Sequence, residues 1–388
     1  MTTPSAPARP LSGFKYFDQL DGLLAPLHPA GTDHDTAGNR RSFFDQYAQL
    51  LLLYDFNPAV TRLRGVRQFT TLEKVQRTFG IRPTALGSLG EAARVFDPAL
   101  LEPIIAELAR WALARPDARP PAEREALAGL IAVDGSLLPA LPRMAWALWQ
   151  DAAHRAAKVH VAFAVWPGTP VRATVTAGTG SERDELRRMA EPGGFDVMDR
   201  GSVEYDLLRE LDAGGSRFVQ RLAENAVYEV ASENPPTDAD RAAGVVRDVV
   251  VRRLGTDKQN DASDRPWRVV RTQGEQPGER WVLVTNAVGL PAELVVRAYR
   301  HRWLVELFFR RLKCILGCRH LLAQNPAGVT IRVYLAVIAS LRIGLWTGAK
   351  PTKRTYELPC HYFNGWATAE EVERYLDTLK QKARPPSK

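Results

Sequence analysis

The spacing of apolar residues divides the chain into a helical beginning, a strand-rich middle and a helical end. Over residues 1–125 apolar positions recur every three or four residues, as in FFDQYAQLLLLYDF and LLEPIIAELARWALA, which is the spacing of amphipathic helices. The proline-rich segment ARPDARPPAERE then breaks this periodicity and predicts a linker. We therefore expect a helical N-terminal region over residues 1–125.

Short β-branched segments after the linker predict an α/β core. They lie at residues 130–134, 158–166, 170–178, 195–199 and 217–222. The segments ERDELRRMA and VEYDLLREL between them have helical spacing. Residues 226–275 contain further strand-like segments without helical periodicity, which predicts an all-β insertion before the next strand at residues 279–286.

A long helix is predicted to begin at PAELVVRAYRHRWLVELFFRRLKCIL, and one of its faces is polar. At about 100° per residue, a single arc of roughly 60° holds Tyr299, Arg302, Glu306 and Lys313. The opposite side is apolar and contains Leu304, Leu307, Phe308, Leu312 and Ile315. The helix is therefore predicted to pack through its apolar side and to present the polar stripe to a partner, although a solvated, salt-bridged face has the same pattern.

The charge around this stripe is unbalanced. Twelve Lys and Arg residues lie between Leu294 and Tyr356, and the one acidic residue among them is Glu306. A formal charge of +8 and a pI near 9.5 favour a polyanionic partner such as nucleic acid. A carboxylate in such a surface opposes the phosphates unless a divalent cation lies between them.

One glutamate is too few for a Mg²⁺ site, so partner carboxylates are expected elsewhere. Asp134 in IAVDGS and Asp199 in FDVMDRGS each follow an apolar strand. Strand ends are a common place for sites in α/β proteins, although Asp and Gly also suit ordinary turns. Considered together with Glu306, the two aspartates favour a metal site.

Composition and cysteine content narrow the class of protein. The 388 residues are 45% hydrophobic and 25% charged, which is typical of a globular protein of two or three domains. Three cysteines are too few for a disulfide framework, MTTPSAPARP lacks a secretion signal, and the apolar run from Val333 is too short to span a bilayer. We therefore expect a soluble intracellular protein without a membrane partner.

A zinc site is not expected from the cysteines. The spacing C-x3-C-x-H of Cys314, Cys318 and His320 matches no standard finger, and the pair Cys360 and His361 does not complete one.

The carboxylates and the polar stripe resemble those of the DDE transposases of bacterial insertion sequences. The resemblance is to insertion-sequence family four, whose signature is Tyr-x2-Arg-x3-Glu-x6-Lys, and it matches Tyr299, Arg302, Glu306 and Lys313 without a gap. It extends through SLGEAARVF, AAKVHVAFAVWPGTPVRATVT, DRGSVEYDLL, FVQRLAEN and WVLVTN. Ser202 departs from the family, since many relatives have Tyr there.

This resemblance implies a ribonuclease-H-like core interrupted by a β-rich insertion. The core would comprise residues 126–222 and 279–346, and the insertion residues 223–278. Residues 1–125 would form a helical DNA-binding region, with TTLEKVQRTFGI as a candidate unit, and the tail at 347–388 could serve in dimerisation.

The resemblance also implies the chemistry. Asp134, Asp199 and Glu306 would hold two Mg²⁺ ions, for which Mn²⁺ could substitute. The DNA-binding residues would be Tyr299, Arg302 and Lys313 near the cleaved phosphate, and Trp281, which would stack on a flipped base during hairpin formation. The protein would bind inverted-repeat ends as a homodimer, cut double-stranded DNA through hairpin intermediates and join the 3′-hydroxyls to target DNA. It would be a bacterial protein of the cytoplasm, associated with the nucleoid.

Two alternatives stay open at this stage. A transposon-derived protein could bind DNA without cleaving it, although the three carboxylates argue against that reading. A metal-dependent nuclease of the same fold could cleave DNA without joining it.

Overall fold

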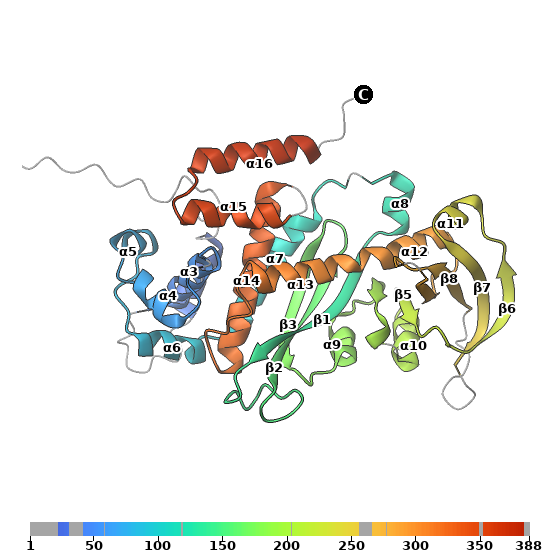
Figure 1. Ribbon diagram of the computed structural model, residues 1–388, viewed down its shortest axis with the longest axis horizontal. Helices are drawn as coiled ribbons and strands as arrows, with labels where there is room; N and C mark the ends of the chain where they lie inside the picture. The colour runs from blue at the N-terminus through green and yellow to red at the C-terminus, as the bar shows by residue number, and fades with distance from the viewer. Residues whose placement is uncertain are drawn as a thin grey trace, which may run out of the picture.

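The computed structural model describes residues 22–30, 42–57, 59–117, 119–202, 204–255, 266–276, 278–348 and 352–383. One long mixed sheet runs through the molecule and is flanked by helices, with the N-terminal helices at one end and strands β6–β8 at the other (Figure 1). The predicted mixed α/β class is therefore confirmed.

Five strands form the half of the sheet that carries the site. They are β1 (Leu130–Ala140), β2 (Arg155–Ala164), β3 (Thr169–Ala177), β4 (Phe195–Met198) and β5 (Arg217–Leu222). The strand order is β3-β2-β1-β4-β5, in which β2 is antiparallel to β1 and β3, while β1, β4 and β5 are parallel. The first strand is longer than the predicted segment 130–134, because its pairing with β2 continues to Ala140.

Four antiparallel strands continue the same sheet beyond β5. In spatial order they are β9 (Arg280–Thr285), β8 (Trp267–Gln273), β7 (Val245–Leu254) and β6 (Tyr228–Asn234). The segment predicted to be all-β also contains the short helix α11 (Asp238–Ala242), which was missed because five residues are too few to show a helical period. Its start is fixed by a capping box between Thr237 and Asp240.

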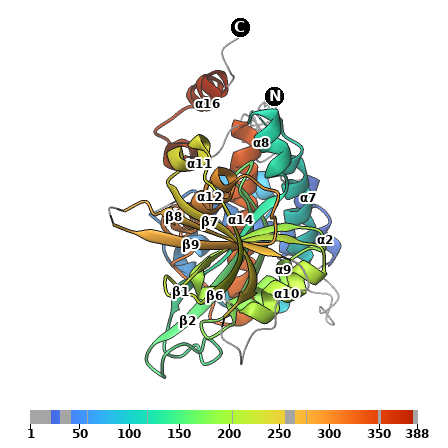
Figure 2. The same ribbon diagram turned by 90° about the vertical axis from the view of Figure 1, so that its right-hand side faces the viewer.

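Helices cover both faces of the sheet (Figure 2). One hydrophobic cluster joins the sheet to α9 (Glu182–Met189) and α10 (Tyr205–Ala213). The larger cluster joins the other face to α12 (Ala292–His301), α13 (Trp303–Cys314) and α14 (Pro326–Thr347). The site residues of β1 and β4 are thus held on a sheet that is packed on both sides.

The N-terminal region forms a series of helices. They are α2 (Leu27–Ala30), α3 (Phe44–Asp55), α4 (Leu63–Phe69), α5 (Glu73–Phe79), α6 (Leu86–Val95) and α7 (Glu102–Leu113), with the 3₁₀ turn η2 (Pro98–Leu101) before α7. Of these, α3, α6, α7 and η2 pack against α14. Part of the predicted linker is helical, since α8 covers Pro121–Ala126. The C-terminal segment forms α15 (Lys353–Phe363) and α16 (Ala369–Ala383).

Helix α14 extends well beyond the apolar run predicted from Val333. Its 22 residues are long and apolar enough to cross a bilayer, but 89% of its most apolar window is buried inside the protein. It contacts α3, α6, α7 and β3. Its apolar character therefore matches a central position in the core.

A buried ion pair joins α14 to the N-terminal helices. Arg332 and Asp55 are both almost completely buried, and Arg332 also donates to the carbonyl of Leu316 and lies 4.7 Å from the ring centroid of Tyr54. Burial raises the pKa of Asp55 to about 7, against the opposing effect of Arg332. The pair couples two regions that are far apart in the sequence.

We predict that Arg332→Met lowers the free energy of unfolding by about 3–5 kcal/mol, because it leaves Asp55 buried without its cation. The double variant Asp55→Leu/Arg332→Met removes both charges and should recover most of this loss. Urea denaturation of both variants measures the effect. A double variant as unstable as Arg332→Met would contradict the coupling of these two residues.

Candidate active site

Three acidic residues from separate parts of the chain lie near one another, where the pairing of β1 with β4 ends. Adjacent parallel strands place Ala132 opposite Val197, so two residues further along Asp134 and Asp199 lie side by side. Helix α13 contacts β1 and contributes Glu306 from its first turn. Asp199 directly follows β4 as predicted, whereas Asp134 does not end its strand and instead lies where β1 ceases to pair with β4.

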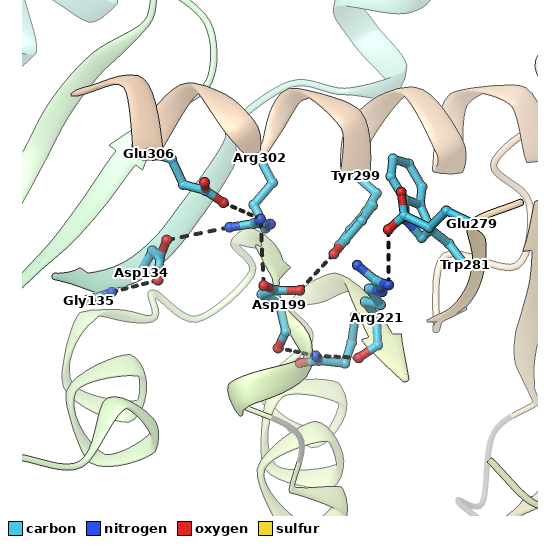
Figure 3. A network of polar contacts seen from close by, with 10 residues as sticks. Asp134, Gly135, Asp199, Arg221, Glu279, Trp281, Tyr299, Arg302 and Glu306 are labelled. Carbon is cyan, nitrogen blue, oxygen red and sulfur yellow. Dashed lines mark hydrogen bonds and ion pairs between the residues drawn. The ribbon is translucent and has the colours of Figure 1, made fainter. Parts of the chain in front are cut away.

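The guanidinium of Arg302 lies between these three carboxylates (Figure 3). Its Nη2 is 2.6 Å from Glu306 Oε1 and 3.6 Å from Asp199 Oδ2, and its Nη1 is 3.4 Å from Asp134 Oδ2. Although burial disfavours its charge, Asp199, Glu306 and Asp134 raise the pKa of Arg302. One cation thus offsets the mutual repulsion of three anions.

Arg302 also divides the predicted long helix in two. Helix α12 ends at His301 and α13 begins at Trp303, while Arg302 keeps helical backbone angles between them. The two helices therefore continue in nearly the same direction across the sheet (Figure 1). The polar stripe predicted for one helix is shared between two.

The apolar side of α13 is rotated relative to the prediction. Phe308 and Leu312 are buried as predicted, but Leu304 and Leu307 are only partly buried. The buried set also includes Val305 and Phe309. The helix packs closely against the core on the side that adjoins the polar stripe.

Asp199 is held in its charged form by its neighbours. The Tyr299 hydroxyl donates to Asp199 Oδ1 at 2.7 Å, and the buried Gln220 side chain donates to the Asp199 carbonyl at 2.6 Å. Burial alone would raise the pKa of Asp199, but Arg302, the Tyr299 hydroxyl, the Arg200 amide and Arg221 together lower it. This carboxylate is therefore charged near neutral pH.

Asp134 has a different environment. Burial raises its pKa to about 6, against the opposing effects of Arg302 and of a hydrogen bond from the Gly135 amide. Glu182 and Glu306 raise the pKa of Asp134 further through their negative charges. A carboxylate of this kind gains from any additional cation nearby.

The ring of Trp281 packs against the ring of Tyr299, whose hydroxyl donates to Asp199. The two rings meet edge to face with centroids 4.9 Å apart, and Trp281 is 5% exposed. Its indole N–H donates to Glu279 at 2.7 Å, and Glu279 also pairs with Arg221 at 3.2 Å. The Trp281 ring is therefore buried in the core. The predicted stacking of this ring on a DNA base is not tested by the structure and stays a prediction.

Lys313 lies further along α13 and is partly buried. Burial lowers its pKa, while Cys314 and Asp134 act in the opposite direction. Each of the four residues of the polar stripe thus interacts with Asp134 or Asp199. Tyr299 and Arg302 contact them directly, and Glu306 and Lys313 interact with Asp134 through their charges.

Gln220, Arg221 and Glu279 were not identified from the sequence. Gln220 and Arg221 belong to β5, which pairs with β4 so that Met198 lies opposite Gln220. Glu279 precedes β9, the partner of β5 on its other side. Their closeness to Asp199 depends on strand order, and no local sequence signal carries that information.

The carboxylate oxygens of the site have the chemistry of a Mg²⁺ site, because hard cations prefer such ligands. As placed, they surround Arg302, and in the described part of the chain no three His, Cys, Asp or Glu side chains enclose a common point suited to a metal ion. Asp134, Asp199 and Glu306 could hold a divalent cation if the Arg302 guanidinium moved aside. Of the cysteines, Cys318 and Cys360 are buried and Cys314 is exposed, and the expectation of no zinc stays a prediction.

Comparison with known proteins connects this geometry to a family. The Transposase DDE domain model matches residues 125–342. "Putative transposase y4zB" of Sinorhizobium fredii (strain NBRC 101917 / NGR234) is 26% identical over 217 residues, which are 56% of this chain and 60% of that protein. The matched part therefore spans about 60% of the relative's length.

Among solved structures, similarity is found to the "Cryo-EM structure of piggyBac transposase synaptic complex with hairpin DNA (SNHP)". The identity is 10% and the TM-score 0.42, over 98% of this chain and 82% of that chain, which is too low a similarity to support a conclusion. The sequence family is decisive, because its match covers more than half of the 388 residues and includes Asp134, Asp199 and Glu306. The chain belongs to the Transposase DDE domain family.

Proposed function

We propose that the protein is a transposase that binds the inverted-repeat ends of an insertion sequence, cleaves the DNA and joins the freed 3′-hydroxyls to target DNA. The observation that carries this proposal is the convergence of Asp134, Asp199 and Glu306 on one cationic group. Membership of the transposase family supports it. The spacing of Tyr299, Arg302, Glu306 and Lys313 supports placement in insertion-sequence family four.

The catalytic core is proposed to be ribonuclease-H-like. The strand order β3-β2-β1-β4-β5, with a single antiparallel strand β2 between β3 and β1, supports this assignment. Strands β6–β8 would be the β-rich insertion, which here extends the core sheet through β9.

Asp134, Asp199 and Glu306 are proposed to hold two Mg²⁺ ions, or Mn²⁺ in their place. When bound, such ions activate an attacking oxygen and stabilise the leaving oxygen in phosphoryl transfer. The chain itself supplies the charge arrangement: Tyr299 keeps Asp199 oriented and charged, while Asp134 lies in a drier environment.

Arg302 and Lys313 are proposed to contact DNA phosphates beside the cleaved bond. A phosphate would offer Arg302 an anionic partner in exchange for the carboxylates that it now contacts. Tyr299 would contribute its hydroxyl, and Trp281 would stack on a flipped base if hairpin formation exposes its ring. The protein is further proposed to act on double-stranded DNA as a homodimer, in the bacterial cytoplasm and associated with the nucleoid.

Two other functions remain distinguishable by experiment. A catalytically silent DNA-binding protein would give no cleavage with Mg²⁺, and a nuclease of the same fold would give cleavage without strand-transfer products. Incubation of the protein with end-containing DNA, Mg²⁺ and a target plasmid separates all three, because only a transposase yields joined products.

We predict that Asp134→Ala, Asp199→Ala and Glu306→Ala each abolish Mg²⁺-dependent cleavage while binding of end DNA persists, since the carboxylates serve the metal rather than the duplex. Cleavage assays and gel-shift titrations measure the two properties. Asp206→Ala, which removes an exposed carboxylate of α10, is the matched control and should cleave normally. Substantial cleavage by any of the three variants would exclude that residue from the site.

The basic residues of the stripe give a second prediction. If they contact phosphates, Arg302→Ala and Lys313→Ala should each lower the slope of log K against log salt by about one unit. Arg302→Ala should also lower the melting temperature, because three carboxylates lose their shared cation. Arg310→Ala removes an exposed arginine of the same helix and serves as the control.

The opposite reading makes Arg302 a purely internal counter-ion. In that case Arg302→Ala would have a lowered melting temperature, but its DNA binding would keep the salt slope of the wild type. End-binding titrations over a salt series, together with thermal melts of the same samples, decide between the two roles.

A further inference from the structure

We propose that Glu182 is a fourth carboxylate of the candidate active site, a positioning residue that is held beside Asp134 by Lys158 and that would hydrogen-bond to the water shell of a bound divalent cation. This inference rests on the proposed function, because it concerns the same site. Glu182 is the first residue of helix α9 and is not part of the transposase signature.

The first observation is a shared cavity. A small cavity of about 70 Å³ is lined by Asp134 and Asp199 together with Glu182, His160 and Gly201. Its volume exceeds the roughly 30 Å³ that one water occupies in the liquid. Glu182 thus faces the same cavity as two of the three acids.

The second observation is that Glu182 lies close to two glycines near the aspartates, Gly135 directly after Asp134 and Gly201 two residues after Asp199. A Cβ on Gly135 would lie 3.1 Å from a carboxylate oxygen of Glu182 and 2.9 Å from Cε of Lys158. A Cβ on Gly201 would lie 3.6 Å from the other Glu182 oxygen. The backbone next to each aspartate therefore approaches one carboxylate, and at Gly135 a side chain would force Glu182 or Lys158 away.

The third observation is the way in which Glu182 is held. Its Oε1 is 2.7 Å from Lys158 Nζ, and Lys158 also donates to the Gly180 carbonyl at 3.4 Å. Ser181 caps the start of α9 and so fixes the backbone of the next residue, Glu182. The side chains of Lys158 and Glu182 are 15% and 32% exposed, so this ion pair is less exposed than an ordinary surface pair.

The chemistry of this arrangement suits a hydrated divalent cation. One carboxylate oxygen of Glu182 is paired with Lys158, which leaves the other near Gly201 to accept hydrogen bonds from metal-bound water. Glu182 is also close enough to act on Asp134 through its charge. Outer groups of this kind orient the direct ligands and increase metal affinity.

The test is Mn²⁺ binding by the full-length protein, followed by electron paramagnetic resonance of the free ion. Glu182→Gln keeps the size of the side chain and removes its charge, and should weaken Mn²⁺ binding about 10–100-fold. The matched control is Asp184→Asn, which removes an exposed carboxylate two residues along the same helix and should bind within about twofold of the wild type.

A second variant separates the loss of Glu182 from the effect of an unpaired lysine. Glu182→Gln/Lys158→Met removes both partners, so it leaves no stray charge and should fold even if the single variant does not. It should still bind Mn²⁺ at least tenfold more weakly than the wild type. Binding like that of the wild type in either folded variant would overturn the inference and reduce Lys158–Glu182 to a structural pair.

Failure of the proposed function has a different signature. Asp134→Asn should abolish Mn²⁺ binding if the site is a metal site. If Asp134→Asn binds like the wild type, or if the wild type does not bind, the metal site itself is contradicted. If only the Glu182 variants behave like the wild type, the site stands and the fourth carboxylate is rejected.

Discussion

The contact of Arg302 with three carboxylates is the interaction on which the site depends. Two like charges about 4 Å apart repel by roughly 4 kcal/mol at the effective dielectric of a protein surface, and three acids meet here. Arg302 lies at the junction of α12 and α13, one helical turn before Glu306. The same residue thus balances the charge of acids from β1, from the end of β4 and from α13.

Under the proposed function, Arg302 and a divalent cation would be alternatives for the same oxygen atoms. A structural ion pair would need no third carboxylate, and Asp134 in particular is poorly compensated, since burial outweighs the effect of Arg302 on its pKa. An excess of negative charge over the single guanidinium is what a metal site requires. Tyr299 donates to one carboxylate oxygen of Asp199 and Gln220 donates to its backbone carbonyl, so the protein itself orients this carboxylate.

The sequence predicted the acids, the polar stripe and the core strands as segments along the chain, since each depends on local spacing. Tyr299, Arg302, Glu306 and Lys313 share a face because helical geometry demands it. The contacts of Arg302 with Asp134 and Asp199 could not be predicted in the same way, because they depend on how β1, β4 and α13 pack. Gly135 illustrates the limit: Asp-Gly in the sequence favours a turn, yet the structure places Gly135 in the middle of β1, where a Cβ would lie within 3.1 Å of Glu182 and Lys158 side-chain atoms and would displace them.

The most direct test of the account is the location of Mn²⁺ by anomalous scattering in crystals of the protein soaked with the ion. The account predicts a peak at coordinating distance, about 2.0–2.2 Å, from oxygens of at least two of Asp134, Asp199 and Glu306, with the Arg302 guanidinium displaced from the position that it has here. A peak elsewhere, with Arg302 still bridging the three carboxylates, would contradict the claim that a divalent cation and Arg302 share one site.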